Sequence, residues 1–200
     1  MKKLLLILLC LPLFFSSCKK EEEQPNTNNS SNLEIGDFYQ GGVIFYLDGN
    51  GGGLIAAPFN QSDAAWGCYG TNINGAEGAD IGTGSQNTID IEAGCTTVGT
   101  AADVCANLTL NGYSDWFLPS RFELREMWEN KWAINYTAEA NGGEYFSNSS
   151  VEYWSSTEYV SNDEYFNESN STLAIPFNQA YTATVKNKGI ACYVRAIRSF

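Results

Sequence analysis

The stretch GYSDWFLPSRFELREMW, residues 112–128, carries the strongest structural signals in this 200-residue sequence. Ser120 and Glu123 have the spacing of a capping box directly after Pro119, and this combination predicts the start of a helix. The apolar residues that follow share one helical face, which indicates packing against a sheet. These residues are Leu124, Met127 and Trp128.

Upstream of this stretch, two short apolar runs flank a glycine-rich segment at residues 48–53. Such an arrangement predicts a β-hairpin over residues 41–57. Asp48 and Asn50 open a D-x-N-x-G pattern, as in a calcium-binding EF-hand loop, but the closing position is Phe59 instead of glutamate. Turn formation is therefore favoured over calcium binding.

Between the hairpin and residue 112, the sequence predicts a long irregular loop and then a short helix. Residues 67–100 contain many Gly, Asn and Thr with little periodicity, and a loop of this length is usually functional or cross-linked. The helix is expected over residues 101–108, with Ala101, Val104, Cys105 and Leu108 facing inward.

Downstream, residues 141–172 are rich in Asn, Ser, Tyr and Glu around one apolar island, YWSS, at 153–156. Strand-like runs follow at 173–177, 181–185 and 190–197. The last run has no polar face, so we expect a strand buried on both sides. We also expect Arg195 and Arg198 to pair with acidic side chains.

Charge limits the partners of the chain. The net charge is −12, and removal of an export signal containing Lys2 and Lys3 leaves 9 basic and 23 acidic residues, so 9 − 23 = −14. Such a surface repels nucleic acid. The sequence contains no histidine, which excludes Ser-His-Asp and Cys-His catalysis. A hydrolase using carboxylates such as Asp163, Glu164 or Glu168 remains an alternative.

The first 32 residues indicate export and a lipid anchor. Residues 1–17 combine a basic start with a short apolar run, as in a signal peptide, and FSSC at 15–18 is similar to a lipobox. We expect Cys18 to be lipidated, residues 18–32 to form a polar tether and residues 33–200 to form one domain. A simple secretory signal is the alternative. The segment KKEEE at 19–23 is either a signal for surface export or a solvated part of the tether, and we expect attachment to the outer membrane.

Four cysteines remain in the expected domain, and an even number in an exported protein favours disulfides. Cys68–Cys95 is the preferred pair, because it would close the long loop, and Cys105–Cys192 is the second. Zinc binding is the alternative, but no C-x-x-C pair occurs. We expect no cofactor, although calcium would be compatible with the many carboxylates.

Several segments, taken in order, resemble the Lcl C-terminal domain family. They are GYSDWFLPS at 112–120, EL at 123–124, YWSST at 153–157 and VRAIR at 194–198. The hairpin and the segment WGCYG at 66–70 resemble a lipoprotein subgroup, so the resemblance extends over residues 36–200. It implies an α+β fold that is a variant of the C-type-lectin-like fold, with a small antiparallel sheet, two short helices and long disulfide-tied loops.

The resemblance also assigns structural roles. The L-P-S turn is similar to the L-P-T turn of formylglycine-generating enzymes, but their cysteine pair has no counterpart here, so enzymatic activity is not implied. We expect Trp116 and Trp154 to be core anchors, with sugar stacking as the alternative. The expected structural motif comprises Trp116, Leu118, Pro119, Ser120, Glu123, Trp154 and Arg195.

The founding member of the family is a collagen-like adhesin that binds sulfated glycans, but this chain lacks collagen repeats and its charge opposes sulfated ligands. We expect a lipoprotein domain that binds a glycan or protein through its loops, because tyrosine offers contact area while Asn and Ser adapt their hydrogen bonds. A structural envelope protein is the alternative. The candidate ligand contacts are Trp66, Tyr69, Tyr145, Tyr159 and Tyr165.

Overall fold

The computed structural model describes residues 33–159, 170–178 and 180–200, and it confirms the α+β class. One sheet has the strand order β1-β2-β3-β9 and is antiparallel throughout. Its strands are β1 (Phe38–Tyr39), β2 (Gly42–Leu47), β3 (Gly53–Ala56) and β9 (Ile197–Ser199). The predicted hairpin is therefore confirmed, with β2 and β3 as its strands.

The second sheet has the order β4-β8-β5-β6-β7. Its strands are β4 (Gln61–Ala65), β5 (Tyr153–Glu158), β6 (Ser171–Ile175), β7 (Thr184–Asn187) and β8 (Ala191–Val194). β5 and β8 pair in parallel, while the other neighbours are antiparallel. The first sheet is the small antiparallel sheet that was expected, and the second, mixed sheet was not predicted, because strand pairing depends on tertiary contacts that the order of strands along the chain does not reveal.

The described residues form four helices instead of two. They are α1 (Gly84–Gly94), α2 (Ala101–Ala106), α3 (Arg121–Glu129) and α4 (Lys131–Ala140). α2 and α3 were predicted, whereas α1 lies inside the expected irregular loop. The buried positions of α1 are mostly small or polar, so the helix has no apolar stripe in the sequence. Asn87 instead donates hydrogen bonds to the Gly78 carbonyl and to Ser156 Oγ.

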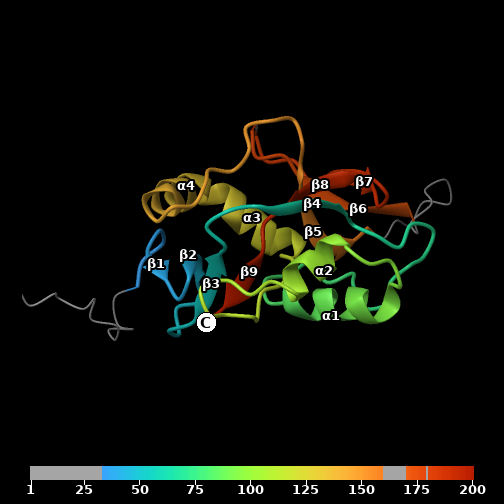
Figure 1. The fold of residues 1–200 in the computed structure, drawn as a ribbon, viewed down its shortest axis with the longest axis horizontal. Helices are drawn as coiled ribbons and strands as arrows, with labels where there is room; N and C mark the ends of the chain where they lie inside the picture. Colours follow the sequence, from blue (N-terminus) through green and yellow to red (C-terminus); the bar gives the residue numbers. More distant parts are fainter. Residues whose placement is uncertain (1–32, 160–169, 179) are drawn as a thin grey trace, which may run out of the picture.

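In Figure 1, α3 and α4 lie over the first sheet, and α1 and α2 lie on the opposite side of the molecule, below the second sheet. The buried side chains form two apolar clusters. Ile44 and Ile55 belong to a cluster with residues of α1 and α2, whereas Val43 and Phe45 pack with residues of α3 and α4. Successive residues of a strand point to opposite faces, so both faces of β2 must be apolar. The run at 190–197 was expected to form one strand buried on both sides, but it is divided between β8 (Ala191–Val194) and β9, which belong to different sheets. Within β8, Cys192 and Val194 lie in one core and the partly buried Tyr193 packs against the other.

The stretch at 112–128 connects these layers. Trp116 and Leu118 enter one core and Phe117 enters the other, where its backbone exchanges two hydrogen bonds with Ile197. Ser120 caps α3 in the predicted box, as its Oγ accepts from Glu123 N and Glu123 Oε2 accepts from Ser120 N. The motif therefore joins α3 to the terminal strand β9.

The buried Glu123 carboxylate also holds the segment before α1. Its Oε1 atom accepts a hydrogen bond from Gly82 N at 2.7 Å. Gly84 approaches so closely that a Cβ there would lie 2.2 Å from Glu123 Oε2. Only glycine leaves room for this contact, so Glu123 fixes the start of α1 as well as that of α3.

Over the ranges that the structure describes, no helix combines the length and the apolar character needed to cross a membrane.

Candidate ligand-binding site

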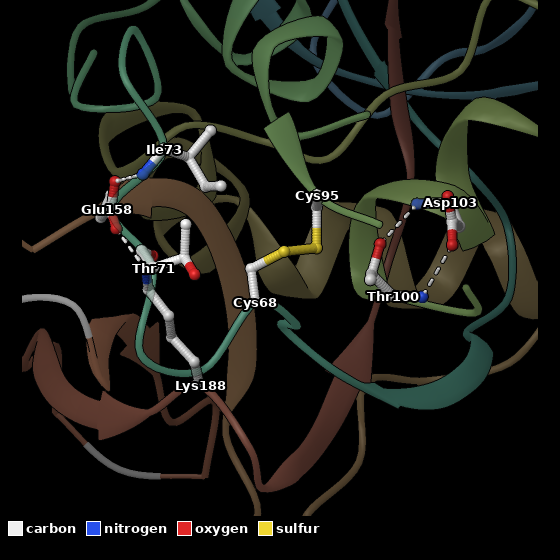
Figure 2. Close-up of a disulfide and its surroundings, with 8 residues drawn as sticks. All are labelled: Cys68, Thr71, Ile73, Cys95, Thr100, Asp103, Glu158 and Lys188. Atoms are coloured by element: carbon white, nitrogen blue, oxygen red, sulfur yellow. Dashed lines mark hydrogen bonds and ion pairs between the residues drawn. A yellow bond between two sulfur atoms is a disulfide. The ribbon is translucent and has the colours of Figure 1, made fainter. Parts of the chain in front are cut away.

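The disulfide Cys68–Cys95 is confirmed, with the two Cα atoms 5.6 Å apart (Figure 2). The second expected pair, Cys105–Cys192, was wrong: both cysteines are free and buried in the apolar core. Burial raises the pKa of Cys192 to about 12 and raises the pKa of Cys105 as well. These two residues behave as small apolar side chains, for which packing is the dominant role.

Trp66 was expected to be exposed for ligand binding, and this was wrong because its side chain is 0 % exposed. The indole N–H donates a hydrogen bond to the Ser155 carbonyl at 2.9 Å. The Lys188 ammonium lies 4.6 Å from the centre of the Trp66 ring, a cation–π contact. The indole N–H already has a hydrogen-bond acceptor and Lys188 covers the ring face, so Trp66 has no surface that a ligand could contact.

Lys188 forms a buried ion pair with Glu158, which the sequence did not reveal (Figure 2). Lys188 Nζ also donates to the Thr71 carbonyl at 2.8 Å, and Glu158 Oε2 accepts from Ile73 N at 2.8 Å. Burial raises the pKa of Glu158, while the lysine and these hydrogen bonds act in the opposite direction. Through their hydrogen bonds to Thr71 and Ile73, Lys188 and Glu158 therefore connect the segment after Cys68 to β5.

The motif residues occupy structural positions. Trp116 and Trp154 are buried, as expected for core anchors. Arg198 pairs with Asp115 through two hydrogen bonds of 2.7 Å, as expected. The same expectation for Arg195 was wrong, because its guanidinium donates to the backbone carbonyls of Ala57 and Glu144.

The remaining candidate tyrosines do not form one site. Tyr69 is exposed and lies beside Gly189, in the turn between β7 and β8. Tyr159 is half-buried and lines a groove beside α3. Tyr165 lies outside the described residues, as do the carboxylates Asp163, Glu164 and Glu168. Tyr145 packs against α4, where it joins residues that the sequence analysis had not selected.

Trp132, Tyr136 and Tyr145 form the most extensive exposed aromatic cluster among the described residues, and we call it the α4 aromatic surface. Their exposed fractions are 60 %, 63 % and 38 %. Trp132 and Tyr136 lie one helical turn apart, with ring centres 6.5 Å apart and planes inclined by 31°. Tyr145 meets Tyr136 edge-on at 6.0 Å. The three rings therefore present contiguous apolar area to solvent.

The local sequence explains this exposure. Ile134 and Ala138 face the core from one side of α4, so Trp132 and Tyr136 must lie on the other side. The Tyr145 hydroxyl donates a hydrogen bond to Glu139 Oε2 at 2.9 Å, which orients the ring and raises the pKa of Tyr145. The signal in the sequence was the i, i+4 spacing of two aromatic residues opposite the apolar pair.

Further rings continue the surface toward α3. Lys131 Nζ lies 4.5 Å from the Trp128 ring centre and 5.9 Å from that of Trp132, and it donates to the Phe177 carbonyl. Trp128 in turn contacts Tyr181 edge-on at 5.8 Å. The edge of the α4 aromatic surface thus carries one ammonium group between two indoles.

Two carboxylates converge elsewhere, at Glu92 of α1 and Asp103 of α2. Burial, with a hydrogen bond and charge repulsion from Asp103, raises the pKa of Glu92 to about 7. Asp103 also completes the capping box of α2 with Thr100 (Figure 2). Neither carboxylate lines the groove beside α3. Among the described residues, no three side chains of metal-ligand type converge.

These features define a small, disulfide-bonded α+β domain with an exposed aromatic surface. The chain belongs to the Lcl C-terminal domain family, which it matches over residues 61–198. The hairpin β2–β3 precedes the matched region but is part of the same fold, because β3 pairs with β9. No curated protein matches the chain in sequence.

Proposed function

We propose that this protein is an outer-membrane lipoprotein, anchored through Cys18, whose domain binds an uncharged glycan on the α4 aromatic surface without catalysing a reaction. The supporting observation is the exposure of Trp132 and Tyr136 side by side on one helix. Exposed apolar patches on folded domains mark interaction sites, and aromatic rings offer large contact area with few rotatable bonds.

The chemistry of the surface favours a sugar. The face of a pyranose ring carries C–H groups that pack on the electron-rich face of an aromatic ring, and its hydroxyls need acceptors and donors nearby. Glu139 and Lys131 supply these at the edge of the α4 aromatic surface. The high negative charge of the chain disfavours sulfated or otherwise anionic glycans.

A glycan-array screen tests the proposal with the unacylated chain, residues 18–200 carrying Cys18→Ser, in the oxidised form. We expect a reproducible hit among neutral glycans, and Trp132→Ala or Tyr136→Ala should weaken it about tenfold or more, ~1.4 kcal/mol. Both side chains are largely exposed, so the folded state should be retained.

Tyr69→Ala is the matched control, because it removes another exposed tyrosine far along the chain from α4. Binding that is lost in this variant but retained in Trp132→Ala would contradict the assignment of the site. A blank array with folded protein would refute glycan binding and leave protein recognition as the function to test.

A further inference from the structure

We propose a second binding site, in the groove beside the start of α3, for a small zwitterion with an apolar side chain, such as a hydrophobic amino acid or dipeptide. The groove has a volume of about 390 Å³, within the range of small-molecule sites. The groove shares no residue with the α4 aromatic surface. The proposal of this second site does not depend on the proposed glycan binding. Its lining combines one cation, one exposed carboxylate and an apolar wall.

The cation is Arg121, the first residue of α3. Its guanidinium lies 5.2 Å from the Phe122 ring centre, and its buried Nε atom has no hydrogen-bond partner. A buried donor without an acceptor costs free energy, so an acceptor supplied by a ligand would be stabilised there. A guanidinium matches the geometry of a carboxylate in particular.

The buried Nε atoms of Arg125 and Arg195 also lack a hydrogen-bond partner, but their guanidiniums donate to acceptors through other nitrogens. Among the described residues, Arg121 differs from the other cations because no acceptor pairs with any part of its guanidinium. Each of the others bonds a carboxylate or a backbone carbonyl through its charged group. They are Arg125, Lys131, Lys186, Lys188, Arg195 and Arg198. The chain has 23 acidic residues, yet Arg121 pairs with no carboxylate among the described residues. Its position at a groove therefore indicates a site for an anionic group of a ligand.

The backbone around Arg121 is fixed, so the site is preformed. Arg121 N donates to Thr157 Oγ1 at 2.9 Å, and Thr157 Oγ1 donates to the Gly78 carbonyl at 2.7 Å. Phe122 N donates to the Ala79 carbonyl at 3.0 Å. These bonds join α3, β5 and the segment before α1, which together form one side of the groove. A preformed site loses little conformational entropy on binding.

The remaining groups define the rest of the ligand. Glu77 is exposed at the groove, and no ion pair joins it to Arg121 in the part of the chain that the structure describes, so its carboxylate is placed to receive an ammonium group. Leu173, Ala183 and Val185 form the apolar wall. The other lining carboxylate, Glu158, is already paired with Lys188. Together these groups match a carboxylate, an ammonium and an apolar side chain.

NMR titration of the isotope-labelled, unacylated chain with L-phenylalanine tests this site. Three related probes each remove one matching group: N-acetyl-L-phenylalanine lacks the ammonium, L-phenylalaninamide lacks the carboxylate and glycine lacks the apolar side chain. We expect L-phenylalanine to shift the Arg121 side-chain N–H signal and the Leu173 and Val185 methyl signals. Each of the three probes should bind about tenfold more weakly or worse.

The variants Arg121→Gln and Glu77→Gln should each weaken L-phenylalanine binding about tenfold. Arg125→Gln is the matched control, since Arg125 lies on the same helix and pairs with Glu126 and Glu129. Equal binding of all four probes, unchanged affinity in Arg121→Gln, or no shifts up to the solubility limit would each overturn the proposal. Glycan binding by Trp132 and Tyr136 would be unaffected in every case.

Discussion

At the scale of single residues, the most consequential side chain is Lys188, which no motif in the sequence identifies. Its ammonium is fully buried between the Glu158 carboxylate, the Thr71 carbonyl and the face of Trp66. Glu158 is 30 residues away in the sequence. Because nothing in local periodicity links two such positions, Trp66 was expected at the surface as a ligand contact.

This contact network predicts a large difference between two neighbouring lysines. Lys188→Met leaves the Glu158 carboxylate buried without its partner and should lower the free energy of unfolding by about 3–5 kcal/mol. Lys186→Met removes only a partly exposed pair with Glu152 and should cost less than about 1 kcal/mol. Urea unfolding of both variants measures the difference, and equal losses would show that the buried pair has no special role.

At the scale of elements, the sequence predicted those that have strong local signals. The capping box at Ser120 and Glu123 located α3, and the glycine-rich turn located β2 and β3. α1 was missed because its buried face contains Asn87 and Thr88, whose hydrogen bonds replace apolar packing.

The candidate site was predicted only in part. Tyr145 was selected from the composition of its loop, and it does belong to the α4 aromatic surface. Trp132 and Tyr136 were missed because α4 itself was missed: α4 starts directly after Asn130, which ends α3, so two helices follow each other without a loop. The groove at Arg121 joins segments far apart in the sequence, and no local pattern could bring them together.

The hydrogen bond between Glu92 of α1 and Asp103 of α2 should make the stability of the fold depend on pH. The raised pKa of Glu92, about 7, means that the folded state holds a proton that the unfolded state releases at lower pH. The stabilising contribution of this proton is complete at pH values below the ordinary carboxyl pKa and is lost as the pH rises through about 7. The melting temperature should therefore fall between pH 5 and 8, and Glu92→Gln should flatten this part of the profile.

The pKa of Asp103 is lowered by its hydrogen bonds with Glu92 and Thr100, despite partial burial. The contribution of Asp103 to folding stability therefore depends on pH in the opposite way to that of Glu92. It is present at neutral pH and is lost as the pH falls into the acidic range. Asp63→Asn, a change at an exposed position, is the control and should leave the slope between pH 5 and 8 unchanged. If Glu92→Gln left the slope of melting temperature against pH unchanged, the proposed protonation of Glu92 in the folded state would be contradicted.

At the scale of the whole molecule, one covalent link holds a domain built from two sheets and two cores. The cross-link Cys68–Cys95 spans 27 positions, and closing a loop of this size restricts the unfolded chain by about 3–4 kcal/mol. Cys105 and Cys192 lie in the apolar core instead. Their thiols should therefore be protected in the folded protein.

Thiol counting tests this arrangement on the unacylated chain. We expect no reactive thiol in the folded state, two after denaturation without reductant and four after denaturation with reductant. The double variant Cys68→Ala, Cys95→Ala should lose about 3–4 kcal/mol of stability in the same urea assay. Recovery of a peptide that links Cys105 to Cys192 would contradict the structure.

The positions of β8 and β9 determine when the fold can form. β8 lies inside the second sheet between β4 and β5, and β9 completes the first sheet beside β3, so both sheets depend on residues 191–199. Ile55 pairs with Arg198, a separation of 198 − 55 = 143 positions. Contacts this distant in sequence make folding slow, because the intervening chain must first be ordered. A ribosome must therefore have synthesised residues 191–199 before either sheet can close, so the fold cannot be completed stepwise from the first strand onward.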